Sequence, residues 1–216
     1  MSAPVCLEIA GVHFTIRCRQ TRVLPDPWEC YRSFRTDGGP TADMISVNLS
    51  IEIGGVPDLS SARRVFESES WSLFAGDGAV YIALAPRPGG LPPAWVARMS
   101  PDFTEGTVFC DEMLVRDNDG VSGIINPILH RLDQLLVMYL LAQREGVIIH
   151  SAGAALNGKG MVFAGRSGAG KSTLSRLLRD HADPTRTVLL SDDRSVVRRI
   201  GSEFLVFGTP WAGDAQ

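Results

Sequence analysis

The sequence predicts a mixed fold class, α+β and α/β, in which a β-rich antiparallel N-terminal part precedes a second part of strands and helices. Apolar and polar residues alternate repeatedly in the first half of the chain. A helical apolar stripe follows, and a glycine-rich loop then joins a short apolar strand to another helix. A chain of 216 residues has room for one domain or two small ones. We expect a β-rich domain over residues 1–120 and a second domain over residues 121–216.

Strand signals dominate the first domain. Residues 45–53 alternate without exception between aliphatic side chains and Ser, Asn or Glu, and residues 12–18 and 80–84 repeat the pattern. Glycine- and proline-containing turns separate these runs. One-sided alternation with short turns is typical of an antiparallel sheet that has one solvated face. No motif of known chemistry falls in this domain, so we expect it to serve recognition or oligomerisation.

A helix is expected between the two sheet regions. Pro127 marks its start and Gly146 its end. Between them, apolar residues recur at helical spacing, and such a stripe normally packs against a sheet. These residues are Ile128, Leu132, Leu135, Leu136, Tyr139 and Leu140.

Charge and composition exclude several classes of protein. The formal net charge is −3, which argues against a dedicated nucleic-acid binder. No apolar run reaches the roughly 18 residues needed to span a bilayer, and the start of the chain lacks the basic residues of a signal peptide. The four cysteines lie far apart, without a CxxC pair, which favours free thiols over a zinc site. We therefore expect a cytoplasmic protein without membrane or nucleic-acid partners.

The most specific motif is a phosphate-binding loop, which matches the Walker A pattern G-x-x-x-x-G-K-[ST] in full. Residues 161–164 read as the strand leading in, and residues 171–179 as the helix leading out. Glycines let successive backbone N–H groups face one concavity, where they can bind phosphate oxygens. The lysine supplies positive charge, and the serine hydroxyl is a suitable ligand for Mg²⁺. The predicted phosphate-binding residues are Gly165, Arg166, Ser167, Gly168, Ala169, Gly170, Lys171, Ser172 and Thr173.

Two aspartates and one histidine complete the candidate site. Asp192 and Asp193 follow the apolar strand 188–191, and His150 follows the apolar run 147–149. The ends of strands in an open sheet gather at the ligand-binding edge, so all three side chains can reach the phosphate loop. One carboxylate can bind Mg²⁺ and the other can accept a proton from an attacking hydroxyl.

Together these residues resemble the catalytic core of HPr kinase/phosphorylase and of the broader group of HPr-kinase-like proteins of bacteria. The likeness covers residues 147–199 and extends to Gly208-Thr209-Pro210-Trp211. It implies a P-loop nucleotide-binding domain with a fold like that of phosphoenolpyruvate carboxykinase. The family's downstream Leu-Glu-x-Arg-Gly-Leu-Gly-Ile segment is absent, so we expect this domain to be truncated at its C-terminus.

The resemblance also implies roles for individual residues. Lys171 and the loop would hold the phosphates of ATP, while Ser172 and Asp193 would hold Mg²⁺. Asp192 would be the general base, with His150 in a supporting or proton-handling role; the division between the two aspartates follows the family pattern only. The family also implies a homo-oligomer.

Three functions remain open at this point. The first is an Mg-ATP-dependent serine kinase, which transfers the γ-phosphoryl to a hydroxyl of a protein, peptide or small molecule. The second is a non-catalytic, ATP-responsive binding or regulatory module, which the missing C-terminal segment favours. The third is a structural role with an empty loop. The intact aspartate pair and His150 favour the kinase, because a sensor has less need of a base.

Overall fold

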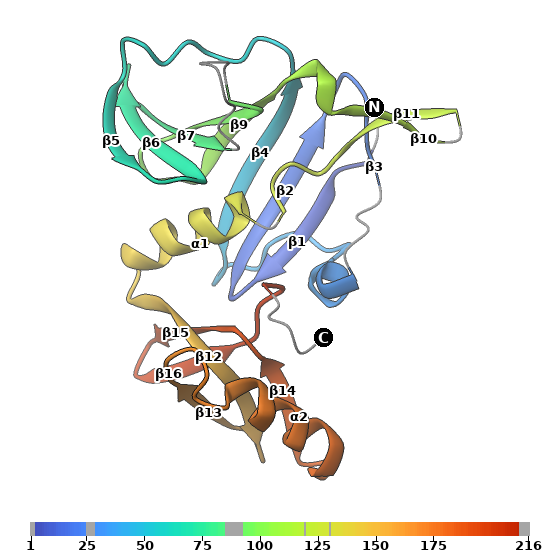
Figure 1. The fold of residues 1–216 in the computed structure, drawn as a ribbon, viewed down its shortest axis with the longest axis vertical. Coiled ribbons are helices and arrows are strands. Elements are labelled where there is room, and N and C mark those ends of the chain that lie inside the picture. The colour runs from blue at the N-terminus through green and yellow to red at the C-terminus, as the bar shows by residue number, and fades with distance from the viewer. Residues whose placement is uncertain (1–2, 25–28, 85–92, 119, 130, 212–216) are drawn as a thin grey trace. The chain divides into compact units, whose positions relative to one another are not determined.

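A computed structural model of the chain describes residues 3–24, 29–84, 93–118, 120–129 and 131–211 (Figure 1). The chain divides into two compact units. The N-terminal unit comprises Met1–Glu8, Val12–Glu29 and Arg35–Leu136, and the C-terminal unit comprises Ile9–Gly11, Cys30–Phe34 and Val137–Gln216. The predicted division at residue 120 stays a prediction.

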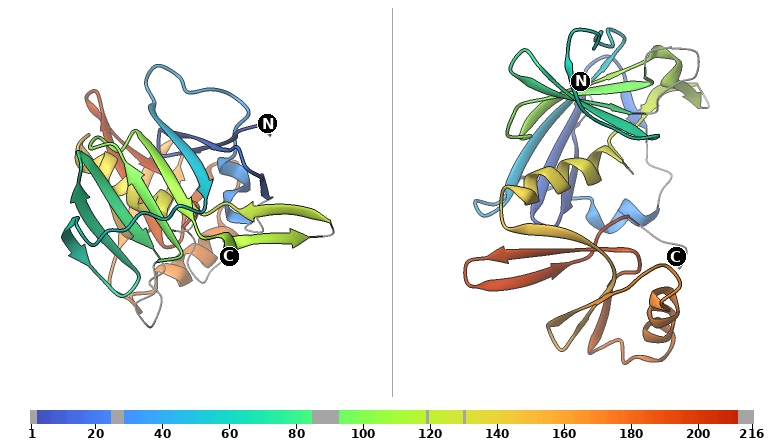
Figure 2. Two further views of the ribbon diagram at one scale, coloured as in Figure 1. Left: turned by 90° about the horizontal axis from the view of Figure 1, so that it is seen from above. Right: turned by 60° about the vertical axis from the view of Figure 1, so that its left-hand side comes forward.

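An eight-stranded sheet forms most of the N-terminal unit, and Figure 2 shows how strongly it twists. Its spatial order is β1-β2-β4-β9-β8-β7-β6-β5. Three of the predicted strands are confirmed here, as β2, β4 and β7. The strands are β1 (Val5–Ile9), β2 (Val12–Cys18), β4 (Ile45–Ile53), β5 (Arg63–Glu67), β6 (Trp71–Gly76), β7 (Ala79–Leu84), β8 (Trp95–Met99) and β9 (Glu105–Cys110).

The predicted purely antiparallel arrangement of this sheet is wrong. The strands from β5 to β9 pair antiparallel, but β2 pairs parallel with β4, and β4 pairs parallel with β9. Parallel neighbours need a long connection, because the chain must return to the same edge before it re-enters the sheet. The chain supplies both connections, one through residues 19–44 and the other through residues 54–104. Alternation alone does not reveal strand direction.

Alternation identified the two faces of β4 correctly. In β4, Val47, Leu49 and Ile51 are buried, whereas the polar residues between them are exposed. Phe14 and Ile16 of β2 are fully buried, but His13 and Thr15 on the other face of this strand are buried too, although alternation predicts them to be solvated. Burying a side chain of this size contributes about 1.5–3 kcal/mol. The wet face of the central strands remains polar.

A small sheet completes the N-terminal unit, and two of the remaining helices contain residues of both units. A three-stranded sheet has the order β10-β11-β3, where β3 is Arg22–Leu24, β10 is Val115–Asn118 and β11 is Val121–Ile125. Short 3₁₀ helices occur at η1 (Glu29–Phe34) and η3 (Glu112–Leu114). The predicted helix is confirmed as α1 (Leu132–Ala142), in which Leu132, Leu136 and Leu140 are fully buried. Its expected start at Pro127 is wrong, because residues 127–129 form a turn.

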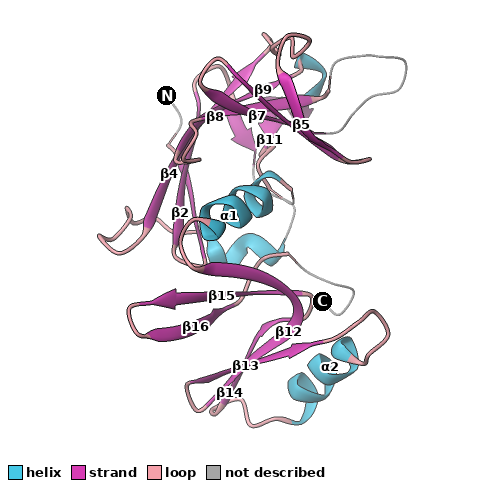
Figure 3. Ribbon diagram, turned by 90° about the vertical axis from the view of Figure 1, so that its left-hand side faces the viewer, coloured by secondary structure: helices cyan, strands magenta, loops and turns pink. Residues whose placement is uncertain are grey.

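The C-terminal unit is organised around one long strand, β12, which curves through it (Figure 3). The first part of β12 pairs with β15, and the last part pairs with β13 on one side and β14 on the other. Helix α2 packs against β12 and β14. The elements are β12 (Gly146–Leu156), β13 (Lys159–Ala164), α2 (Lys171–His181), β14 (Thr187–Ser191), β15 (Arg194–Ile200) and β16 (Glu203–Phe207).

The predicted fold class of this unit is also wrong. We expected an α/β P-loop domain like that of phosphoenolpyruvate carboxykinase, but the described residues form antiparallel sheets with little helix. The tight turn at Asn157-Gly158, where both residues have positive φ, folds β13 back onto β12. Strand β14 then pairs with the other edge of β12, so β13 and β14 never become neighbours. The hairpin therefore prevents a continuous parallel sheet.

Candidate functional site

The strands that lead into the predicted site end close together. Ala164, the last residue of β13, lies opposite Ser151 of β12, and Ser191, the last residue of β14, lies opposite Gly153. The two strands run in the same direction on either side of β12. Their ends are thus only two residues apart along β12, and the phosphate loop and the aspartate pair leave the sheet at the same edge. The expected gathering of strand ends occurs although the sheet is antiparallel.

The phosphate loop joins β13 directly to α2. Gly168 and Gly170 adopt the left-handed conformation, with φ of 81° and 88°, which side chains disfavour. The Ala169 N–H donates to the Arg166 carbonyl over 3.1 Å and closes the turn. Gly170 caps α2 and offers no side-chain hydrogen bond to the first N–H groups of the helix. These N–H groups and the positive end of the helix dipole can therefore bind an anion.

Lys171 lies over the loop that it follows. Its Nζ donates to the carbonyl of Gly165 over 2.8 Å and to that of Arg166 over 3.1 Å. The hydroxyl-bearing residues Ser172 and Thr173 come next and are exposed. The ammonium group therefore already sits at the loop, with its charge available to an anionic ligand. The loop residues Ser167 and Ala169 are exposed as well.

Asp193 is the centre of a polar cluster. Its Oδ1 lies 3.0 Å from Nδ1 of His150, and its Oδ2 accepts a hydrogen bond from Arg194 over 2.5 Å. His150 Nδ1 also lies 3.1 Å from the Asp193 carbonyl oxygen. Both neighbours of Nδ1 are acceptors, so we assign the proton of the neutral ring to Nδ1. Nε2 is then left as an acceptor on a side chain that is 51% exposed.

Asp192 lies one residue earlier and in a different environment. It is buried, with 6% of its surface exposed, whereas the Asp193 side chain faces His150 and Arg194. The chain bends at both aspartates, and the Ser191 hydroxyl accepts from the N–H of Asp193 and from that of Arg194 over 3.4 and 3.1 Å. This irregular end of β14 separates the two carboxylates.

The segment at Gly208–Trp211 supports this bend. The Thr209 hydroxyl donates to the Arg194 carbonyl over 2.6 Å, and both Thr209 and Trp211 are buried. Gly208 approaches β14 so closely that a Cβ there would lie 2.2 Å from the Leu190 carbonyl oxygen. Sequence reasoning noted this segment without a role, and it missed Arg194 as a partner of Asp193. The adjacency of Arg194 to the aspartate pair was the available signal.

Metal binding by protein side chains alone finds no support. Among the described residues, no group of three His, Cys, Asp or Glu side chains could hold a metal ion. Each oxygen of Asp193 has a second lone pair, so the bonds to His150 and Arg194 leave room for one further contact. The donor set thus suits a cation that takes most of its ligands from phosphate oxygens and water, as Mg²⁺ does in phosphoryl-transfer sites.

Comparison with known proteins gives no further guide to this site. No protein-family model, curated protein or solved structure matches the chain. None of the helices in the described part of the chain is long and apolar enough to cross a membrane.

Proposed function

We propose that the chain is a cytoplasmic, Mg-ATP-dependent kinase that transfers the γ-phosphoryl group to a serine-type hydroxyl of a protein, peptide or small molecule. The observation that supports the proposal is that two features follow the neighbouring ends of strands β13 and β14. These are the N-terminus of α2, which has no side-chain cap and follows a full phosphate-loop motif, and the aspartate pair after β14.

The nucleotide side of the proposal rests on the loop. The N–H groups at the start of α2 would bind the β- and γ-phosphates, and Lys171 would exchange its bonds to the Gly165 and Arg166 carbonyls for phosphate oxygens. The Ser172 hydroxyl and one oxygen of Asp193 would hold Mg²⁺, which neutralises phosphate charge.

The acceptor side rests on Asp192 and His150. In the transfer, the acceptor oxygen bonds to the γ-phosphorus, the bond from that phosphorus to the bridging oxygen of ADP breaks, and the hydroxyl proton passes to Asp192. Asp193 holds His150 through Nδ1, so His150 Nε2 would be free to accept a proton or a hydrogen bond from the acceptor hydroxyl. The resemblance to HPr kinase/phosphorylase agrees with these roles and, with the homo-oligomer that it implies, remains part of the proposal.

The sequence provides a matched pair of variants for the test. Lys159 and Lys171 are its two lysines, and Lys159 is exposed at the start of β13. We expect Lys171→Ala to abolish ATP binding and ADP formation, and Lys159→Ala to retain both. ADP production and transfer of labelled γ-phosphate to candidate acceptors would be measured. Equal loss in both variants, or unchanged turnover in Lys171→Ala, would contradict the proposal.

A second candidate is a non-catalytic, ATP-responsive binding module. The observation in its favour is that Lys171 is already bonded to loop carbonyls, as a loop that only senses nucleotide would allow. ATP binding that requires Lys171 but yields no ADP, with or without acceptors, would favour this module over the kinase.

A further inference from the structure

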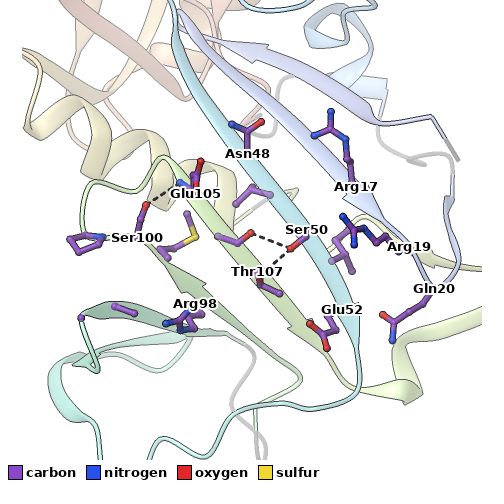
Figure 4. Close-up of a pocket in the computed structure, with 17 residues that line it drawn as sticks. Arg17, Arg19, Gln20, Asn48, Ser50, Glu52, Arg98, Ser100, Glu105 and Thr107 are labelled. Atoms are coloured by element: carbon purple, nitrogen blue, oxygen red, sulfur yellow. Dashed lines mark hydrogen bonds between the residues drawn. The ribbon is translucent and has the colours of Figure 1, made fainter. Parts of the chain in front are cut away.

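The solvated face of the large sheet in the N-terminal unit forms a groove with a volume of about 980 Å³ (Figure 4). Its walls come from β2, β4, β8 and β9, from the start of β7, and from the segments that follow β2, β6 and β8. Clefts of roughly 300–1,000 Å³ are typical of small-molecule sites. All the lining residues belong to the N-terminal unit, so the groove is independent of the phosphate loop.

One row of side chains crosses the middle of the groove. Arg17 lies opposite Ser50, Ser50 lies opposite Thr107, and Thr107 lies opposite Arg98. Cross-strand partners point to the same face, so the row reads guanidinium, hydroxyl, hydroxyl, guanidinium. Strands lie about 4.8 Å apart, which places the two arginine Cα atoms about 14 Å from each other. Long side chains from both flanks can therefore meet on one small ligand.

The three arginines of this groove have no bonding partner among the described residues. Arg17, Arg19 and Arg98 are exposed and form no hydrogen bond or ion pair with another described residue. Figure 4 shows Arg17 and Arg19 on one flank, Arg98 on the other, and the bonded hydroxyls between them. The two hydroxyl oxygens are 3.0 Å apart, and one hydrogen suffices for that bond. When Ser50 donates this bond, the Thr107 hydroxyl hydrogen can turn toward a ligand. When Thr107 donates it, the Ser50 hydroxyl can donate to the Gly106 carbonyl oxygen 3.5 Å away.

Two glutamates flank this row. Glu105 lies opposite Asn48, and these two residues precede Thr107 and Ser50 by two positions in their strands. Glu52 lies on the other side of the row, two positions after Ser50. Alternate residues on one face are about 6.6 Å apart along a strand. With three arginines and two glutamates the groove carries a net charge of +1, although the whole chain carries −3. The centre thus favours an anion, while the flanks offer acceptors for hydroxyl donors.

We propose that this groove binds a small phosphate ester that carries several hydroxyl groups, of the sugar phosphate class. The phosphate would lie over Ser50 and Thr107 between the guanidinium groups of Arg17 and Arg98, with Arg19 beside it. A tetrahedral phosphate can accept from donors on several sides, whereas a carboxylate has only two oxygens. The ligand hydroxyls would donate to Glu52, Glu105 and the Asn48 amide oxygen. This inference does not rest on the kinase activity.

Titration calorimetry of the full chain with glucose 6-phosphate tests the proposal. Glucose and inorganic phosphate are the comparison ligands. The titrations are repeated in the Lys171→Ala variant, so that binding at the phosphate loop is separated from binding in the groove. We expect one groove site for glucose 6-phosphate in both chains, weaker binding of inorganic phosphate, and still weaker binding of glucose. Binding that vanishes in Lys171→Ala, or no binding at all, would overturn the proposal and leave the kinase proposal untouched.

Substitutions on opposite flanks locate the site. We expect Arg17→Gln and Arg98→Gln each to weaken glucose 6-phosphate binding about tenfold or more, because each removes a charge-assisted hydrogen bond. Arg63→Gln is the matched control, since Arg63 is exposed on β5 and does not line the groove. Ser50→Ala, which keeps all three cations, should weaken binding less. Equal affinities in Arg17→Gln, Arg98→Gln and Arg63→Gln would refute the assignment.

Discussion

The two candidate sites of this chain are built in opposite ways. The C-terminal site uses residues at the ends of strands, where short runs of sequence such as Gly165–Ser172 and Ser191–Arg194 carry nearly all the polar groups. The N-terminal groove uses residues in the middle of strands, and its central row joins Arg17, Ser50, Thr107 and Arg98 across four strands. The first kind of site is local in sequence, and the second exists only through strand register.

The two sites should also differ in how well they tolerate mutations. A site at strand ends depends on the exact course of a few bends, so a small backbone shift displaces its groups. A site on a sheet face is held by the hydrogen-bonded ladder, so a single side chain can change while its neighbours stay in register. We therefore expect backbone changes to be most damaging in the C-terminal unit and side-chain changes to be graded in the N-terminal unit.

The largest effect is expected for Asp192→Asn. Loss of a general base typically costs about 10²- to 10⁴-fold in rate, and the replacement is nearly isosteric at this buried position. ADP formation under single-turnover conditions would be measured. Asp180→Asn, an exposed aspartate on α2, is the control and should keep full activity. A rate within a few-fold of the unaltered chain would remove Asp192 from the reaction, whereas groove binding should stay unchanged.

The next effect concerns the bend that holds the aspartates. Gly208→Ala would place a Cβ 2.2 Å from the backbone oxygen of Leu190, which cannot move away as a side chain could. We expect a loss of about 3 kcal/mol in the free energy of unfolding, together with reduced ATP turnover. Gly39→Ala is the control, because its Cβ would meet no atom within 4 Å. Denaturant unfolding measures both, and equal stability of the two variants would contradict this account.

A smaller effect should appear in the N-terminal unit at high pH. Burial raises the pKa of the Cys110 thiol to about 12, and nearby Cys18 adds to the shift. Between the ordinary thiol pKa of 9.0 and this value the folded chain keeps a proton that the unfolded chain loses. The free energy of unfolding should therefore be about 1.4 kcal/mol lower at pH 10 than at neutral pH, and unaffected well below pH 9.

Cys110→Val isolates that contribution. The variant should show a flatter decline of the free energy of unfolding above pH 9, while Cys6→Val should keep the slope of the unaltered chain. Unfolding curves at several pH values provide the measurement. Parallel declines in all three chains would show that Cys110 does not titrate as described.

The smallest effect is expected at Ser100, which lines the groove after the end of β8. Side-chain hydrogen bonds from Ser100 and Thr104 lower the pKa of the Asp102 carboxyl. Ser100→Ala should raise that pKa toward its ordinary 3.8, as followed by NMR titration. A carboxyl with a lowered pKa stabilises the fold above its ordinary pKa, and this is lost as pH falls through the lowered value. At neutral pH the change should stay within about 0.5 kcal/mol. An unchanged Asp102 titration would show that the Ser100 hydroxyl does not act on it.

Much of each site could be predicted where its chemistry is local. Alternation in residues 45–53 identified the buried and solvated faces correctly, because side-chain direction in a strand has a period of two. In residues 12–18 it identified the apolar face, but His13 and Thr15 on the other face are buried as well. The phosphate loop was found with its strand and helix in place. The sequence predicted that His150 and Asp193 lie at the same edge of the sheet, but not that they form a contact. The bond of Arg194 to Asp193 was not predicted.

The sequence by itself determined the phosphate loop, the two faces of residues 45–53 and the strand that ends in two aspartates. Each of these depends on neighbours within a few residues. Tertiary structure alone decided that β2, β4 and β9 run parallel, that β12 separates β13 from β14, and that Arg17 and Arg98 flank one row. Pairing between distant strands depends on how connections close and which faces can be buried together, and these long-range terms leave no periodic pattern in the sequence.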